Sequence, residues 1–178
     1  MPNSDRKSLH LWVLRHAKAA AHGTGGDKTR PITSRGRRQA AAVCEHIASM
    51  KDRSALPELV LCSQAVRAQE TADLVMPSLP DARFELDDAL YSVDGTGLIA
   101  WLKILDPDVS SLMVVGHNPT LQELCVMLTA FPTSEEIDSE GLATAALVEL
   151  EQPDTASWSQ LEMGGSRLVH RFTPAKNG

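Results

Sequence analysis

Four basic side chains, each standing within a few residues of the end of an apolar run, are suited to bind and transfer a phosphoryl group. They are Arg15, His16, Arg67 and His117. An arginine presents a planar, permanently charged fork that matches phosphoryl oxygens. Imidazole, with an ordinary pKa of about 6.5, can be neutral and nucleophilic at cellular pH. A neutral His16 could attack phosphorus while the arginines stabilise the equatorial oxygens and His117 hydrogen-bonds them.

Each of these residues, taken alone, has an ordinary structural explanation. An Arg or His at a strand end is usually a solvated edge residue. Arg67 could lie on the wet face of a first helical turn, and His117, before Asn-Pro, could simply begin a helix. The case for chemistry therefore depends on whether the chain brings the four together.

Three apolar runs predict the strands that must position them. The runs cover 9–14, 58–62 and 111–115, and near-continuous apolar character is typical of strands buried on both faces. Helical patterns alternate with them, which predicts an α/β fold with three layers, α/β/α, around a mostly parallel sheet. Ligands of such sheets bind beyond the carboxyl ends of the strands, so the three junctions are expected to meet at one edge.

Capping residues predict where the helices begin. Thr33 or Ser34 begins the first long helix, Ser63 caps the next, and Asn118 caps a third with Pro119 at its first position. Helix N-termini supply backbone donors and a positive dipole end to an anion. Ser63 and Asn118 are therefore predicted to take part in substrate binding.

The remaining pattern predicts smaller elements and one domain over residues 1–178. These elements are an extended segment at 83–86, a helix around 98–105, and late strands at 143–150 and 158–163. We expect the core to span about 9–164, with a polar N-terminal stub and a loose tail at 173–178.

Composition narrows the class of protein. The chain has 178 residues, 43% hydrophobic and 22% charged, which is typical of a globular domain. A net charge of −6 argues against nucleic acid or an anionic membrane as partner. Cys44, Cys62 and Cys125 form no CxxC pair, which favours core residues in a reducing, cytoplasmic setting. The polar N-terminus does not read as a signal peptide or a membrane span.

Three motifs occur in an order that resembles a known family. Residues 14–17, Leu-Arg-His-Ala, resemble the Arg-His-Gly signature of the histidine phosphatase superfamily, which includes the phosphoglycerate mutases. Residues 63–72 resemble its second motif, a serine and an arginine ahead of a Gln-Thr-Ala-type helix start. Residues 115–119, Val-Gly-His-Asn-Pro, resemble the third.

Further segments look like the short phosphohistidine phosphatases of the SixA type. They are 27–39, Leu90-Tyr91 and 131–133, and the resemblance runs from about residue 10 to 150. It implies a phosphoglycerate mutase-like fold and a phosphatase that needs no metal or cofactor. Its substrate would be phosphohistidine in a protein or a small phosphoester. It also implies a role for each matching position: His16 is the phosphorylated nucleophile, Arg15 and Arg67 bind phosphate, and His117 completes the pocket.

The chain departs from the family pattern at two points. Ala17 stands where glycine is usual, and its methyl group is tolerable only if φ is negative. Many members also place a glutamate between the second and third motifs to protonate the leaving oxygen. Here that interval offers four carboxylates outside any recognisable motif: Glu85, Asp87, Asp88 and Asp94. Of these we predict Asp88 as the proton donor.

Two other functional classes remain open from the sequence. One is a phospho-ligand binding module that has the same pocket but no turnover, which Ala17 and the undefined acid favour. The other is a metallohydrolase using His16, His117 and carboxylates. It has little support, because no HxxxH or HxH pair exists and two arginines would repel a cation. The glycine-rich stretch 22–29 does not match a phosphate-binding P-loop, because His22 and Asp27 occupy both glycine positions.

Overall fold

A six-stranded sheet forms the centre of the computed structural model, which describes residues 8–50, 55–130 and 133–175. The strand order is β3-β2-β4-β1-β5-β6. The first four strands in the sequence pair in parallel, β5 runs antiparallel to β1, and β6 antiparallel to β5. The strands are β1 (Leu9–Arg15), β2 (Leu59–Ser63), β3 (Arg83–Asp87), β4 (Ser111–Gly116), β5 (Leu147–Gln152) and β6 (Arg167–Phe172).

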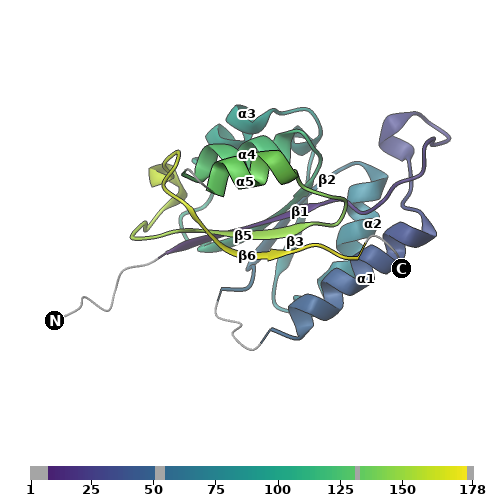
Figure 1. The fold of residues 1–178 in the computed structure, drawn as a ribbon, viewed down its shortest axis with the longest axis horizontal. Helices are drawn as coiled ribbons and strands as arrows, with labels where there is room; N and C mark the ends of the chain where they lie inside the picture. Colours follow the sequence, from purple (N-terminus) through teal and green to yellow (C-terminus); the bar gives the residue numbers. More distant parts are fainter. Residues whose placement is uncertain (1–7, 51–54, 131–132, 176–178) are drawn as a thin grey trace.

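Helices cover both faces of this sheet, which confirms the predicted α/β class and its three layers. Figure 1 shows α1 and α2 on one face and α3, α4 and α5 on the other. The helices are α1 (Ser34–Ala48), α2 (Val66–Val75), α3 (Gly95–Leu102), α4 (Thr120–Leu128) and α5 (Thr133–Glu140). Short 3₁₀ helices include η1 (Asp27–Thr29), η3 (Ala89–Tyr91) and η4 (Trp158–Gln160).

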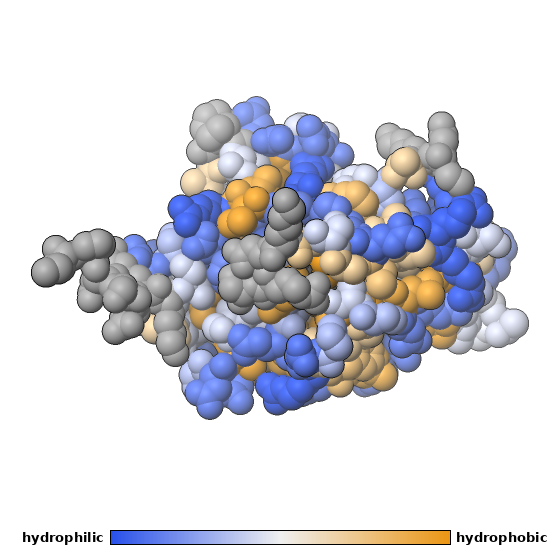
Figure 2. All heavy atoms as spheres, turned by 90° about the horizontal axis from the view of Figure 1, so that it is seen from below, coloured by the Kyte–Doolittle hydropathy of each residue, from blue (hydrophilic) through white to orange (hydrophobic). Residues whose placement is uncertain are grey.

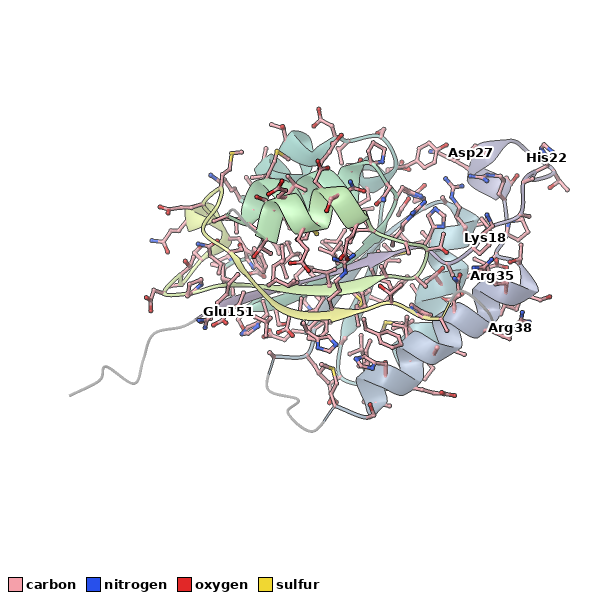
Figure 3. All side chains as sticks on the ribbon, in the orientation of Figure 1. Lys18, His22, Asp27, Arg35, Arg38 and Glu151 are labelled. Carbon is pink, nitrogen blue, oxygen red and sulfur yellow. The ribbon has the colours of Figure 1, made fainter. Side chains whose placement is uncertain are left out.

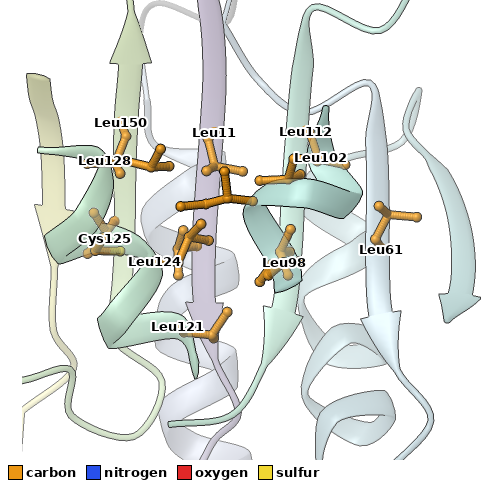
Figure 4. Close-up of a cluster of buried hydrophobic side chains, with 14 of the residues drawn as sticks. Leu11, Leu61, Leu98, Leu102, Leu112, Leu121, Leu124, Cys125, Leu128 and Leu150 are labelled. Carbon is orange, nitrogen blue, oxygen red and sulfur yellow. The ribbon is translucent and has the colours of Figure 1, made fainter. Parts of the chain in front are cut away.

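Side chains of the central strand β1 point alternately to the two faces of the sheet, so the core has two layers. Leu11 and Val13 of β1 belong to the cluster under α3, α4 and α5, whereas Trp12 and Leu14 belong to the cluster under α1 and α2. Figure 4 shows leucines of α3 and α4 packed over Leu11 and its neighbours in β4. The central strand β1 is therefore buried on both faces, and Arg15 and His16 stand at its carboxyl end.

Two predicted helix caps are wrong. Ser63 is the last residue of β2, and α2 begins at Val66 after an N-cap residue whose side chain makes no capping bond. In α4 the cap position is Pro119, which follows a cis peptide bond with Asn118. The polar side chains of Ser63 and Asn118 are engaged with other groups near the strand ends instead.

The predicted late strands also need correction. The first begins only at Leu147, because the chain turns at Ala145, where φ is 60° and the backbone N–H bonds the carbonyl of Arg15. The second, at 158–163, is wrong: Trp158 lies in η4 and anchors its indole N–H on the Val109 carbonyl, 2.6 Å away. The sixth strand is β6, beyond the predicted core limit, and α5 was not predicted.

The face of the molecule seen from below has a mixed polar and apolar surface. Figure 2 shows hydrophilic side chains interspersed with smaller hydrophobic areas on that face. Within the described ranges, no helix is both long and apolar enough to span a bilayer.

Candidate active site

The carboxyl ends of three neighbouring strands bring the sequence-predicted residues to one edge of the sheet. β4 pairs with β1 on one side and β2 on the other, and Arg15 lies opposite Gly116 in the register. The His16 N–H donates to the Gly116 carbonyl at 3.0 Å. The imidazole rings of His16 and His117 consequently lie with their centroids 5.1 Å apart, tilted by 55°. The expected meeting of the strand ends is confirmed.

The His16 ring is held in one orientation by its neighbour. Its Nδ1 lies 2.8 Å from the Ala17 carbonyl, which can only accept, so Nδ1 carries the proton. In the neutral ring this assignment leaves the lone pair on Nε2. His16 therefore presents its Nε2 lone pair at the strand end.

The His117 ring takes the opposite tautomer. Its Nε2 lies 2.8 Å from Ser63 Oγ, which already accepts from the Ala65 N–H. Among the described residues the hydroxyl proton of the buried Ser63 has no other acceptor, so we assign it to His117 Nε2, which leaves the ring proton of His117 on Nδ1. That Nδ1 is buried and has no hydrogen-bond partner among the described residues. His117 thus keeps a free N–H donor at the site.

Both histidines are neutral at physiological pH. Burial lowers the pKa of His16 to about 4, and the positive charges of Arg67 and Arg15 act in the same direction. Burial, followed by the neighbouring His16, lowers the pKa of His117 to about 3. The His16 ring therefore stays neutral well below the pH at which an ordinary histidine becomes protonated.

This environment predicts an unusual pH profile. A histidine with a lowered pKa is deprotonated above that value, so kcat/KM should stay on its plateau from neutral pH down to about pH 5. The measurement is kcat/KM for 4-nitrophenyl phosphate against pH, corrected for the ionisation of the substrate itself. An acid limb with an apparent pKa near 6.5 would show that His16 is not buried as described.

Each of the two arginines has a buried Nε that makes no hydrogen bond to the described residues. Arg15 Nη1 donates to the Leu142 carbonyl at 2.5 Å, and the buried Arg67 donates through both terminal nitrogens to Asp27. Buried polar groups are normally satisfied, and an acceptor with several oxygens would satisfy donors that lie together at one edge. A phosphoryl group is such an acceptor.

Asp27 is a site residue for which the sequence analysis assigned no role. The Arg67 guanidinium binds Asp27 through both terminal nitrogens: Nη1 donates to the Asp27 carbonyl at 2.7 Å and Nη2 to Asp27 Oδ2 at 2.8 Å. The Tyr91 hydroxyl donates to the same Oδ2 at 2.9 Å, and the Tyr91 ring meets the His117 ring edge-on. Arg30 Nε donates to Oδ1 at 2.8 Å. Hydrogen bonds from Tyr91 and Arg67 hold the pKa of Asp27 at about 2, so it stays ionised.

The bonds between Asp27 and Arg67 predict that loss of Asp27 weakens phosphate binding, although removal of a negative charge alone would strengthen it. Because Asp27 fixes the end of the guanidinium and leaves Nε free, we expect Asp27→Ala to weaken inhibition by inorganic phosphate about 10-fold. Electrostatics alone predicts tighter phosphate binding once a carboxylate is lost. Asp27→Asn, which keeps an acceptor, should show a smaller loss, and Asp81→Asn on the exposed surface serves as control. Tighter phosphate binding in Asp27→Ala would show that Asp27 competes with the substrate.

Ala17 fits the site without strain. Its φ is not positive, and its methyl group is fully buried in the cluster under α1 and α2. The Ala17 N–H donates to Thr71 Oγ1, which in turn donates to the Arg67 carbonyl. This chain of bonds ties the first motif to the second.

The predicted acid, Asp88, is not brought into contact with the histidines or arginines. Its side chain is 74% exposed and lies 4.0 Å from Lys28 Nζ. Of the other candidates, Glu85 is exposed on β3, Asp87 accepts from the Ala89 N–H, and Asp94 caps α3. Asp88 stays a prediction from the sequence.

Asn118 is placed beside the site by its amide. Its Nδ2 donates to the Leu142 carbonyl at 3.1 Å, the oxygen that Arg15 also uses, and its Oδ1 is buried without a partner among the described residues. Nowhere in the described chain do three or more His, Cys, Asp or Glu side chains cluster in a way that could hold a metal ion. The donors at this edge suit an anion.

Comparisons with known proteins agree with this geometry. Residues 11–95 match the family model of the histidine phosphatase superfamily, branch 1. The chain is 30% identical over 167 residues to the uncharacterized protein MT1313 of Mycobacterium tuberculosis, covering 90% of this chain and 99% of the relative.

Solved structures share the fold. The structure assigned as phosphohistidine phosphatase SixA of Agrobacterium tumefaciens has a TM-score of 0.77 at 24% identity, covering 93% of this chain and 98% of that one. The protein histidine phosphatase SixA complexed with tungstate has a TM-score of 0.71 at 22% identity, covering 93% and 97%. The family match, a relative aligned over nearly its whole length, and the ordered strand-end motifs show that this chain belongs to the histidine phosphatase superfamily.

Proposed function

We propose that the chain is a metal-independent phosphatase that uses His16 as its nucleophile and forms a phosphohistidine intermediate. The observation that carries this proposal is the set of free donors around a neutral ring: Arg15 Nε, Arg67 Nε and His117 Nδ1 are all buried and unpaired among the described residues. They lie at the strand ends beside His16, whose Nε2 lone pair is available.

The reaction follows from these positions in two steps. In the first, the Nε2 lone pair of His16 forms a bond to phosphorus while the bond to the leaving group breaks and its electron pair departs with that group. Arg15, Arg67 and the Nδ1–H of His117 donate to the equatorial oxygens, whose charge they stabilise. In the second, water attacks phosphorus, the P–N bond breaks, and phosphate and neutral His16 are restored.

The proposed substrate class rests on the similarity to solved SixA structures and on the partly exposed residues at the edge of the site. The similar structure from Agrobacterium tumefaciens is named as a phosphohistidine phosphatase, and the other, named as a protein histidine phosphatase, holds tungstate, a tetrahedral oxyanion like phosphate. Asp27, which contacts Arg67, is exposed in η1, and Tyr91, which donates to Asp27, is half-buried in η3. We propose phosphohistidine in a protein, or a small phosphoester, as substrate.

The absence of a placed acid predicts the choice of leaving group. An alkoxide needs a positioned general acid, worth about 10²–10⁴ in rate, whereas a phenolate or a protonated imidazole needs far less help. We expect a preference of that order for phosphohistidine and aryl phosphates over alkyl phosphates. The measurement is kcat/KM over a panel of matched phosphopeptides, aryl phosphates and alkyl phosphates.

Asp88→Asn separates the two possible outcomes of that panel. Comparable turnover of alkyl and aryl phosphates by the wild type, both collapsing in Asp88→Asn, would overturn the preference and make Asp88 the acid. Binding of phosphate with no release of product from any substrate would instead favour a binding module without turnover.

A further inference from the structure

A groove beside the phosphate site runs along the exposed side of α4. Its volume is about 730 Å³, within the range of small-ligand sites. Three apolar residues, Pro119, Val126 and Met127, contribute to its lining, and three carboxylates, Asp94, Glu123 and Asp138, stand around them. We call these six residues the α4 groove.

The α4 groove begins at the active site. Asn118, which also lines this cavity, directly follows His117 and shares the Leu142 carbonyl with Arg15. Its Oδ1 is buried and unpaired within the described part of the chain, although Asn118 itself is partly exposed. A group attached to a phosphate held by Arg15 and His117 can therefore extend directly into the groove.

Basic and acidic side chains lie on different parts of the protein surface. Lys18, Arg35 and Arg38 lie together near the N-terminal end of α1 in Figure 3, on the sheet face opposite α4. Helices α3, α4 and α5 contain no Lys or Arg at all, and α5 alone carries Glu135, Glu136, Asp138 and Glu140. This basic group and the acidic α4 groove thus lie on opposite sides of the sheet.

The carboxylates of the groove are positioned but not neutralised. Asp94 accepts from the Gly97 N–H at 2.7 Å, Glu123 from the Gly95 N–H at 3.0 Å, and Asp138 from the Gln122 side chain at 3.2 Å. All three donors are uncharged, and none of the described residues that line the cavity is basic. A cation entering the groove would meet fixed negative charge above an apolar floor.

We infer that the α4 groove binds a polypeptide segment that carries lysine or arginine within a few residues of the phosphorylated side chain. The inference rests on the proposed phosphatase function and names the kind of substrate it selects. Long basic side chains suit this surface, because their methylene stems cover apolar residues while the charged end reaches a carboxylate. Anionic leaving groups, such as nucleotides or sugar bisphosphates, are disfavoured there.

The test measures kcat/KM for two peptides of equal size, pTyr-Ala-Lys-Lys and pTyr-Ala-Glu-Glu. Each peptide is tested with the wild type and with the variants Asp138→Lys and Glu136→Lys. Both substitutions reverse one charge on an exposed position of α5, but only Asp138 lines the groove. At low ionic strength we expect Asp138→Lys to lower the Lys-to-Glu ratio of kcat/KM about 10-fold and Glu136→Lys to lower it less than 2-fold. The difference should vanish near 1 M salt, where charges are screened within about 3 Å.

An unchanged ratio in Asp138→Lys, or an equal fall in Glu136→Lys, would overturn the inference while leaving the phosphatase proposal intact. Turnover of 4-nitrophenyl phosphate by the wild type reports on the phosphatase proposal separately. Dissociation constants for the same peptides with a non-hydrolysable phosphonate report on the groove without turnover. In that measurement too, only Asp138→Lys should lower the Lys-to-Glu preference, and thermal melts verify that both variants fold.

Discussion

His16→Ala is expected to lower kcat by about 10⁴-fold or more while the protein remains folded. Among the described side chains at the strand ends, His16 alone has a ring nitrogen lone pair that makes no hydrogen bond, so we expect nothing to replace the imidazole as nucleophile. The structural cost is small, because His16 is only half-buried and its side chain makes one hydrogen bond, to the adjacent carbonyl.

The measurement pairs turnover of an aryl phosphate with a thermal melt. His22→Ala is the matched control, since His22 is an exposed histidine in the loop that follows β1. Residual turnover of His16→Ala within about 10-fold of the wild type would mean that another group attacks phosphorus. An unfolded His16→Ala would direct the same test to His16→Asn, which keeps a hydrogen-bonding side chain.

Arg67→Ala carries the second large expected effect, a loss of about 2–4 kcal/mol in transition-state stabilisation, or roughly 10²–10³-fold in kcat/KM. In the proposed mechanism, removing the guanidinium would take one donor from the phosphoryl oxygens, and it would also break the bonds from Arg67 to Asp27. Arg67→Lys should recover only part of the loss, because an ammonium cannot hold Asp27 and the phosphate through separate edges of one planar fork.

Steady-state kinetics of the two variants, with Arg37→Ala as control, separates charge from geometry. Arg37 is an exposed arginine paired with Glu70, and its loss should change kcat/KM less than 2-fold. Full recovery of activity in Arg67→Lys would show that Arg67 supplies positive charge alone and that its clamped orientation has no part in catalysis.

The central strands could be predicted from sequence because burial on both faces leaves a strong local signal. The apolar runs that became β1, β2 and β4 contain few polar residues, and their ends fixed the place of the site. The end of the chain could not be predicted in this way. The strand β6 has mostly exposed or half-buried residues, and Trp158 looks like part of a strand until its indole is seen anchored on Val109.

In the candidate site, too, some residues could be predicted from the sequence and others could not. Arg15, His16, Arg67 and His117 could be predicted because strand topology alone brings them together. The contact of Asp27 with Arg67 spans 40 residues and that of Tyr91 with Asp27 spans 64, and neither leaves a periodic signal in the sequence. Both positions lie in segments that resemble the SixA-type phosphatases, which was the available hint. Ser63 was expected as a helix cap, but its hydroxyl orients His117 instead.

The most direct measurement is the capture of the covalent intermediate. The wild type is mixed briefly with a fast aryl phosphate, quenched without acid, digested and analysed by mass spectrometry. We expect one phosphoryl group, labile to acid, on the peptide that contains His16, and none in His16→Ala. An acid-stable phosphoserine at Ser63, or a phosphoryl group on His117 with His16 unmodified, would contradict a mechanism in which His16 is the nucleophile.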